Sequence, residues 1–199
     1  MVMTVASGEP SARRRLLAVA EDLFLESGYD RVSVRAINSA AGMNPAAVHY
    51  HFGSKDDLVV ALLEDRLAPL WADRLADLAA RWEQGRAPSV DELVDVVLAP
   101  LTTLATGAAG RLHLQLLARF VLGRTRVGWT SRWHDPAAWA RLLCAARPDL
   151  SEREAARRWV LAFDLILQTF GTPLTDVPST GTVPVGTLRA FVTAGLAAP

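Results

Sequence analysis

The residues best suited to chemistry in this 199-residue chain lie within residues 44–58, NPAAVHYHFGSKDDL. This segment holds two of the four histidines, His49 and His51, and the only lysine, Lys55, followed by two aspartates. Such a group of side chains fits three kinds of site. It can form a metal centre, supply a catalytic histidine, or make a surface that binds a negatively charged partner.

The spacing of His49 and His51 argues against a metal centre. On a helix with 3.6 residues per turn, two side chains at this spacing point about 200° apart. No cysteine, aspartate or glutamate stands at the usual ligand spacing from them. The sequence also has no G-x-S-x-G elbow, no local Cys-His pair and no Gly-rich phosphate loop. We therefore expect no metal, no cofactor and no enzymatic activity, although an all-helical enzyme without a signature remains an alternative.

Composition indicates an ordinary globular protein, with 51% apolar residues, 21% charged residues and a formal net charge of zero. The single Cys144 cannot form an internal disulfide. The longest uncharged, apolar-leaning stretch, residues 96–110, is too short and too rich in threonine to span a bilayer, and no apolar segment precedes the first arginines. We expect a cytoplasmic protein that does not contact a membrane.

Charge and tryptophan are unevenly distributed. Residues 11–55 contain six basic and four acidic residues, whereas the remainder contains fifteen basic and seventeen acidic residues. All six tryptophans lie beyond residue 70. The slight basic excess permits a DNA-binding first region without demonstrating one. The two contrasts together indicate two regions with different purposes.

Apolar residues recur three and four positions apart along the chain, and no convincing strand pattern occurs, so the predicted fold class is all-α. Expected helices cover residues 11–27, 33–42, 44–52, 55–82, 90–105, 111–122, 136–146, 151–170 and 184–196, and residues 171–186 read as a loop. Pro69 should kink or divide the long helix at 55–82. Ser54, Ser89 and Ser151 each precede an acidic residue by three positions, which is typical of a capped helix start.

Residues 33–52 predict two short helices joined by a tight turn. Ser33 can cap the first helix, and Gly42 can adopt the positive φ of the turn. Asn44 is a suitable N-cap for the second helix, with Pro45 at the first helical position. This is the helix-turn-helix arrangement, whose second helix is suited to the major groove of DNA.

The second short helix has an inner and an outer side. Val48 and Phe52 are four residues apart and would face the core. The outer side and the N-terminal end would present Asn44, Pro45, Ala46, Ala47, His49 and Tyr50. Small alanines allow close approach to a base, and the polar side chains can bond to bases or phosphates. The same pattern also fits ordinary surface residues and helix-forming alanines.

Residues 33–58, SVRAINSAAGMNPAAVHYHFGSKDDL, resemble the signature of the tetracycline-repressor-like (TetR) family of bacterial transcriptional regulators. The resemblance extends back through AVAEDLFLESGYDRVSV and covers about residues 11–65. It implies a three-helix DNA-binding domain at 11–58, with its helix-turn-helix motif at about 33–52. It also implies a larger helical domain at 59–199 that binds a ligand and forms a homodimer.

The function implied by the resemblance is sequence-specific regulation of transcription. The chain would be a repressor that leaves a palindromic operator in double-stranded DNA when a small apolar or amphipathic effector of unknown identity binds. Ser33 and Lys55 would hold phosphates, and the full set of implied DNA contacts is Ser33, Arg35, Asn44, Pro45, Ala46, Ala47, His49, Tyr50 and Lys55. A helical dimeric adaptor that no longer binds DNA remains an alternative.

Three residues depart from the family pattern. Ala36 stands where an acid is frequent, Asn38 where a small residue is common, and His49 where Tyr or Asn is frequent. The operator sequence therefore does not follow from the resemblance.

Two further sets of residues are predicted in the second region. Candidates for the effector pocket are Trp71, His113, Leu117, Phe120, Trp129, Trp133 and Phe163. Apolar stripes on the last two helices are candidates for the dimer interface, at Trp159, Ile166, Phe170, Leu188, Phe191 and Val192. At helical spacing, most such residues are also ordinary core residues.

Overall fold

The structure of the protein is a computed structural model that describes residues 11–123, 128–130, 136–171 and 184–199. Every regular element in these ranges is helical, which confirms the all-α prediction. The elements are α1 (Ala12–Ser27), a 3-10 turn η1 (Tyr29–Arg31), α2 (Val34–Ala40), α3 (Ala47–Phe52), α4 (Lys55–Glu83), α5 (Val90–Ala105), α6 (Ala108–Leu122), α7 (Pro136–Ala146), α8 (Glu152–Gly171) and α9 (Val185–Ala197).

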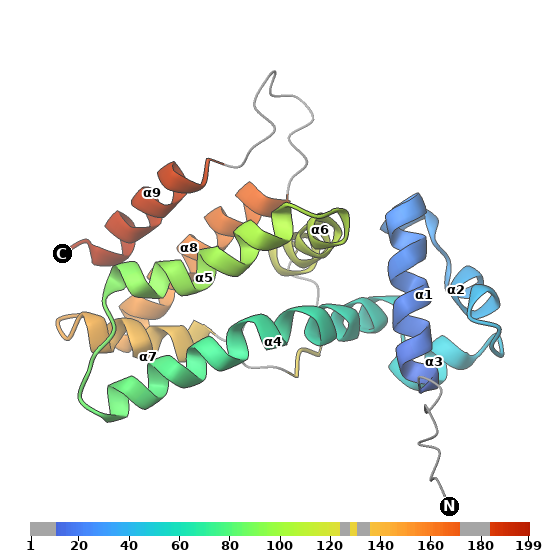
Figure 1. The fold of residues 1–199 in the computed structure, drawn as a ribbon, viewed down its shortest axis with the longest axis horizontal. Coiled ribbons are helices and arrows are strands. Elements are labelled where there is room, and N and C mark those ends of the chain that lie inside the picture. Colours follow the sequence, from blue (N-terminus) through green and yellow to red (C-terminus); the bar gives the residue numbers. More distant parts are fainter. Residues whose placement is uncertain (1–10, 124–127, 131–135, 172–183) are drawn as a thin grey trace, which may run out of the picture. The chain divides into compact units, whose positions relative to one another are not determined.

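The chain forms two compact units, Met1–Leu62 and Leu63–Pro199, which meet within α4. In the first unit α1 packs against α2 and α2 packs against α3 (Figure 1). Its core includes Leu16, Phe24, Ile37, Val48 and Leu58, each at most 1% exposed. Because these residues come from four helices, the helices are held as one small body around a shared apolar centre.

In the second unit α8 packs against α6, α7 and α9, and α5 packs against α6, α7 and α9 (Figure 1). The largest fully buried side chains there include Trp139 and Trp159, whose ring centroids lie 5.2 Å apart. None of the helices in the described part of the chain has the length and apolarity needed to cross a bilayer.

The predicted serine caps are present at three helix starts. The Ser54, Ser89 and Ser151 hydroxyl oxygens each accept a hydrogen bond from the backbone N–H three residues on, at 3.0, 3.1 and 3.2 Å. Each cap satisfies an amide that has no partner within its own helix. The starts of these helices are therefore determined locally, by contacts between residues three positions apart in the sequence.

Pro69 does not divide the long helix, because α4 runs without interruption from Lys55 to Glu83. A proline lacks only its own N–H, so one backbone hydrogen bond is lost. The flanking residues Leu67 and Trp71 are 0% and 3% exposed, and their burial stabilises the helix on both sides of the proline. The expectation of a division at Pro69 was therefore wrong.

Helix α6 begins three residues earlier than expected, at Ala108, so Gly110 lies inside its first turn. A side chain at this position would overlap the backbone of Leu104, at the end of α5. Gly110 thus allows the α5–α6 turn to close tightly. Its position inside a helix could not be distinguished from a loop glycine by propensity alone.

Replacing Gly110 by alanine is expected to destabilise the second unit by about 1–3 kcal/mol, because the obstructing atoms are backbone and cannot rotate away. Gly186→Ala is the matched control, since Gly186 also lies in a helix but has no atom within 4 Å of an added Cβ. Urea unfolding followed by tryptophan fluorescence measures both. Equal stability of the two variants would contradict the steric reading.

Helix α9 is fixed at both ends by arginines. Near its start, Arg189 donates to Asp95 of α5 at 2.6 and 2.9 Å and lies 3.1 Å from Asp91. The hydrogen bond from Arg189 lowers the pKa of Asp95 below its ordinary value. This ion pair joins two helices that are far apart in sequence, α5 and α9.

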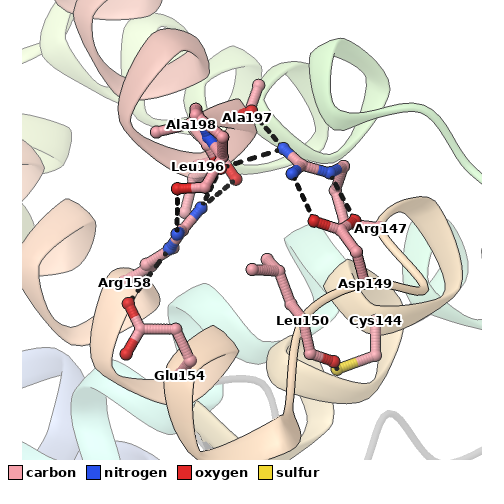
Figure 2. Close-up of polar contacts among 10 residues, drawn as sticks. Cys144, Arg147, Asp149, Leu150, Glu154, Arg158, Leu196, Ala197 and Ala198 are labelled. Atoms are coloured by element: carbon pink, nitrogen blue, oxygen red, sulfur yellow. Dashed lines mark hydrogen bonds and ion pairs between the residues drawn. The ribbon is translucent and has the colours of Figure 1, made fainter.

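At the other end of α9, Arg147 and Arg158 converge on the last backbone carbonyls (Figure 2). Arg158 donates to the carbonyls of Leu196 and Ala198 at 3.3 and 2.6 Å, and Arg147 donates to Ala198 at 3.1 Å. Two positive groups at a helix C-terminus satisfy free carbonyls and complement the helix dipole. We refer to Arg147 and Arg158 as the arginine clamp.

Candidate nucleic-acid interface

The first unit contains the predicted pair of short helices, α2 and α3, joined by a turn at Gly42, whose φ is 65°. The Ser33 hydroxyl accepts from the Ala36 N–H at 3.1 Å, so the predicted cap of α2 is confirmed. The start of α3 differs from the prediction, because the helix begins at Ala47 and not at Pro45. The Asn44 side chain instead caps the Ala46 N–H at 2.9 Å, within a turn that leads into the helix.

A buried asparagine holds α2 and α3 together. Asn38 is 1% exposed; its amide nitrogen donates to the Pro45 carbonyl at 2.5 Å, and its oxygen accepts from the Val48 N–H at 3.1 Å. Val48 lies in the first turn of α3, where N–H groups have no helical partner, and Pro45 lies in the turn that leads into the helix. Asn38 therefore sets the position of the second helix, a role that sequence reasoning missed. The available signal was a polar residue four positions after Val34, on the predicted inner side of α2.

The outer side of α3 matches the prediction. Val48 is fully buried, whereas Asn44, Pro45, Ala46, His49 and Tyr50 are exposed and Ala47 is half-buried. Tyr50 is the most exposed of the large side chains at 85%. Phe52 is half-buried, and His51 is also half-buried, with its ring edge-on to Tyr50 and Phe52. The structure thus collects six of the nine predicted DNA-contacting residues on or just before one short helix.

Ser33 and Arg35 are exposed at the start of α2. Because the Ser33 oxygen accepts the capping bond, its own O–H remains able to donate to a phosphate oxygen. Arg35 adds a positive charge two residues on. The resemblance implies a phosphate contact for Ser33 and a DNA contact for Arg35, and both contacts stay predictions.

Lys55 lies in a more enclosed setting than a surface phosphate clamp would suggest. Its ammonium group donates to the Tyr29 carbonyl at 2.5 Å and sits 3.8 Å from the centroid of the Tyr29 ring. The Tyr29 hydroxyl in turn donates to Asp56, the next residue of α4. Lys55 therefore ties the start of α4 to the turn after α1, a structural role that the sequence did not reveal.

A further basic residue lies close to α3. Arg13, at the start of α1, places its guanidinium 5.1 Å from the centroid of the Phe52 ring, the last residue of α3. Arg13 is exposed, as are its neighbours Arg14 and Arg15. The sequence showed Arg13 as charge only, and its proximity to α3 required the packing of α1. Arg13 therefore adds a positive charge beside the end of α3.

The described residues contain no group of three or more His, Cys, Asp or Glu side chains arranged to hold a metal ion. His49 makes a polar contact with the backbone, since its Nδ1 lies 2.8 Å from the Gly53 carbonyl oxygen. His49 and His51 thus belong to the surface and edge of α3.

The predicted pocket residues fall mainly inside the second unit. Trp71, His113, Leu117 and Phe120 are buried, Trp129 and Phe163 are half-buried, and Trp133 lies outside the described residues. Phe163 stacks on Trp159 at 5.2 Å and meets Trp139 edge-on at 5.9 Å. The buried Trp159 indole N–H has no hydrogen-bond acceptor among the described residues.

The structure corrects most of the predicted dimer stripe. Its members Trp159, Ile166, Phe170, Leu188 and Val192 are at most 7% exposed within a single chain, so they have almost no surface left for a second subunit. Phe191 is the exception, at 69% exposed. The apolar spacing marks whichever side of a helix is buried and does not distinguish its own core from a partner. The exposed apolar residues of α8 are instead Val160 and Leu161, at 45% and 71%.

Two short helices joined by a tight turn, with the outer side of the second helix exposed, define the helix-turn-helix class of DNA-binding domain. The family model described as bacterial regulatory proteins, tetR family, matches residues 16–62, which cover most of the first unit. Residues 16–62 therefore carry the DNA-binding domain of this family.

Named relatives agree with this assignment. The chain is 35% identical over 68 residues to the HTH-type transcriptional repressor AcnR of Corynebacterium glutamicum, covering 33% of this chain and 36% of AcnR. It is 33% identical over 72 residues to the HTH-type transcriptional regulator BetI of Rhizobium meliloti, covering 36% of each. The chain thus matches only about a third of the length of these curated relatives.

A solved structure resembles nearly the whole chain. NalD of Pseudomonas aeruginosa, the secondary repressor of the MexAB-OprM multidrug efflux pump, is 26% identical with a TM-score of 0.59. The match covers 92% of this chain and 94% of NalD. The second unit therefore shares its helical architecture with the larger part of a known repressor.

Proposed function

We propose that this protein is a sequence-specific transcriptional regulator that binds an operator in double-stranded DNA. The observation that carries the proposal is α3, whose outer residues are exposed while Val48 is buried and Asn38 fixes the start of the helix. The names of AcnR and NalD as repressors support repression as the mode of action. A regulator of transcription works where the DNA is, so a cytoplasmic location is part of the proposal.

We further propose that the two units are functional domains, with DNA binding at 11–58 and ligand binding and dimerisation beyond. A single α3 covers only one half-site, because a recognition helix contacts a few base pairs in one major groove. A homodimer with twofold symmetry would place two such helices on a palindromic operator, about one DNA turn apart or slightly further. The covalent link between the domains is α4, which belongs to both units.

The outer sides of α8 and α9 are the proposed dimer interface. Leu161 and Phe191 are large apolar side chains left exposed in a single chain, at 71% and 69%. On α9, Phe191 is accompanied by exposed small residues, Ala190, Ala194 and Gly195, which allow close approach of a second helix. Two helices from each subunit would form a four-helix interface.

Replacing Phe191 by glutamate is expected to dissociate the dimer, because each interface would then bury two unpaired carboxylates. Analytical ultracentrifugation should show monomers at micromolar concentration, and operator affinity should fall at least tenfold since the two half-sites no longer bind together. Gln115→Glu, an exposed position on α6 that adds the same charge away from α8 and α9, is the control. If the Phe191→Glu protein stays dimeric, the dimer interface lies elsewhere on the chain.

The second domain is proposed to bind a small apolar or amphipathic effector. Support comes from the aromatic group Trp139, Trp159 and Phe163, in which the buried indole N–H of Trp159 has no acceptor among the described residues. An effector releases DNA only to the extent that it binds the DNA-free state more tightly. Quenching of tryptophan fluorescence provides the screen for such compounds.

The regulator function is tested with DNA from upstream of the protein's own gene. Fluorescence anisotropy at moderate salt should show tighter binding to this DNA than to a random duplex of equal length, by a factor of at least about 10³. Equal affinity for both duplexes, with an intact dimer, would instead favour a helical adaptor that does not read DNA. Turnover of a small molecule without any DNA binding would favour an enzyme.

A further inference from the structure

The ring of His49 is held in one orientation by the end of its own helix. Gly53 follows α3 with φ of 89°, and its N–H donates to the His49 carbonyl at 3.0 Å. The Gly53 carbonyl oxygen lies 2.8 Å from Nδ1 of the His49 ring. His49 and Gly53 are thus joined through both backbone and side chain, while the His49 side chain remains exposed.

This contact fixes which ring nitrogen carries the proton. A carbonyl oxygen can only accept a hydrogen bond, so Nδ1 must donate. A neutral imidazole has one N–H, and Nε2 is therefore left as a bare acceptor. The tautomer of neutral His49 thus follows from its contact with the Gly53 carbonyl oxygen, which cannot donate a hydrogen bond.

A bare acceptor restricts what His49 can bind on DNA. Phosphate oxygens, guanine N7 and O6 and thymine O4 are all acceptors, so neutral His49 cannot bond to them. The donors in the major groove are the amino groups of adenine N6 and cytosine N4. We propose that His49 is a specificity-determining residue that accepts a hydrogen bond from one such amino group in each half-site, an inference that rests on the proposed DNA-binding function.

Asn44, which lies just before α3, is left as a hydrogen-bond donor where His49 is left as an acceptor. Its side-chain oxygen already accepts from the Ala46 N–H at 2.9 Å, which leaves its NH₂ group to donate. The exposed surface around α3 therefore presents a donor before the helix and an acceptor in its first turn. A sequence with complementary acceptor and donor positions satisfies both, whereas a non-specific phosphate contact satisfies only the donor.

The test begins with selection of duplexes from a random library by the full-length protein at about pH 8.5, well above the pKa of a free imidazole. Each base pair of the selected half-site is then marked in turn with N6-methyladenine or N4-methylcytosine. These bases keep Watson–Crick pairing but replace the major-groove amino hydrogen with a methyl group. Every base pair contains one such amino group, so every position can be tested.

Affinities are compared for wild type and His49→Phe, which keeps a flat ring but lacks nitrogen. At one position per half-site, the methyl mark is expected to weaken wild type roughly five- to tenfold and to change His49→Phe by less than twofold. Each ratio compares two duplexes on the same protein, so any loss of folded protein cancels.

Two results would overturn the proposal. The first is equal loss in both proteins at every sensitive position, which means that another residue contacts the amino group. The second is a wild type insensitive to every mark, which means that His49 reads no base. Failure of wild type to enrich any sequence would refute the proposed function as well, and the selection step alone reveals it.

Discussion

Replacing Asn38 by leucine is expected to cost the first unit about 2–4 kcal/mol and to abolish operator binding. The substitution leaves the buried Val48 N–H and the part-buried Pro45 carbonyl without their hydrogen bonds, and an unpaired buried group costs about 1–3 kcal/mol. A small domain has only a few kcal/mol of net stability, so a loss of this size is large. The second helix of the motif would lose the contact that positions it.

The two units can be followed separately in this experiment. All six tryptophans lie in the second unit, so their fluorescence reports on that unit alone, while hydrogen exchange of peptides covering residues 33–52 reports on the motif. Asn38→Leu should accelerate exchange in the motif and leave the fluorescence transition of the second unit in place. Ser39→Ala, an exposed change one residue away, is the control and should alter neither. Slow exchange in the Asn38→Leu protein would show that the motif does not depend on this side chain.

Lys55→Ala is expected to weaken binding to all DNA sequences about equally, by roughly tenfold. If Lys55 neutralises one phosphate in each subunit, the slope of log affinity against log salt should fall by about 0.9 per subunit. The same substitution removes the hydrogen bond to the Tyr29 carbonyl and the contact with its ring, which should cost the first unit about 1 kcal/mol.

The salt slope separates the two roles of Lys55. A purely structural lysine would lower the fraction of competent protein and leave the slope unchanged. Lys55→Arg, which keeps the charge, should preserve the slope even if the fit against Tyr29 is poorer. An unchanged slope for Lys55→Ala, measured by anisotropy between 50 and 200 mM salt, would assign Lys55 to the internal contact alone.

Local signals in the sequence predicted the helices well. Serine caps, the stop at Gly28 and the turn at Gly42 act over three or four residues, and the structure places each where expected. The outer side of α3 also followed from spacing, because burial of Val48 determines which residues point away. Features of this kind need no knowledge of distant parts of the chain.

Contacts between elements could not be predicted in the same way. Asn38 binds the backbone of the next helix, Lys55 binds the turn after α1, and Arg13 reaches the end of α3. Each partner is seven or more residues away and is defined by packing. The dimer interface predicted from the apolar stripes of α8 and α9 was largely wrong for a related reason. Periodicity shows which side of a helix is buried, but it does not show whether the same chain or a partner subunit buries that side.

The arginine clamp and the Arg189 ion pairs hold α9 by its ends, and Leu188, Val192 and Leu196 hold it along its inner side. The outer side of the helix therefore contributes nothing to keeping α9 in place. Substitutions there can alter which subunits recognise each other without unfolding either one. A cell that holds several related regulators could keep them from mixing by varying this one surface, and the same freedom makes α9 the natural place to engineer a regulator that pairs only with a chosen partner.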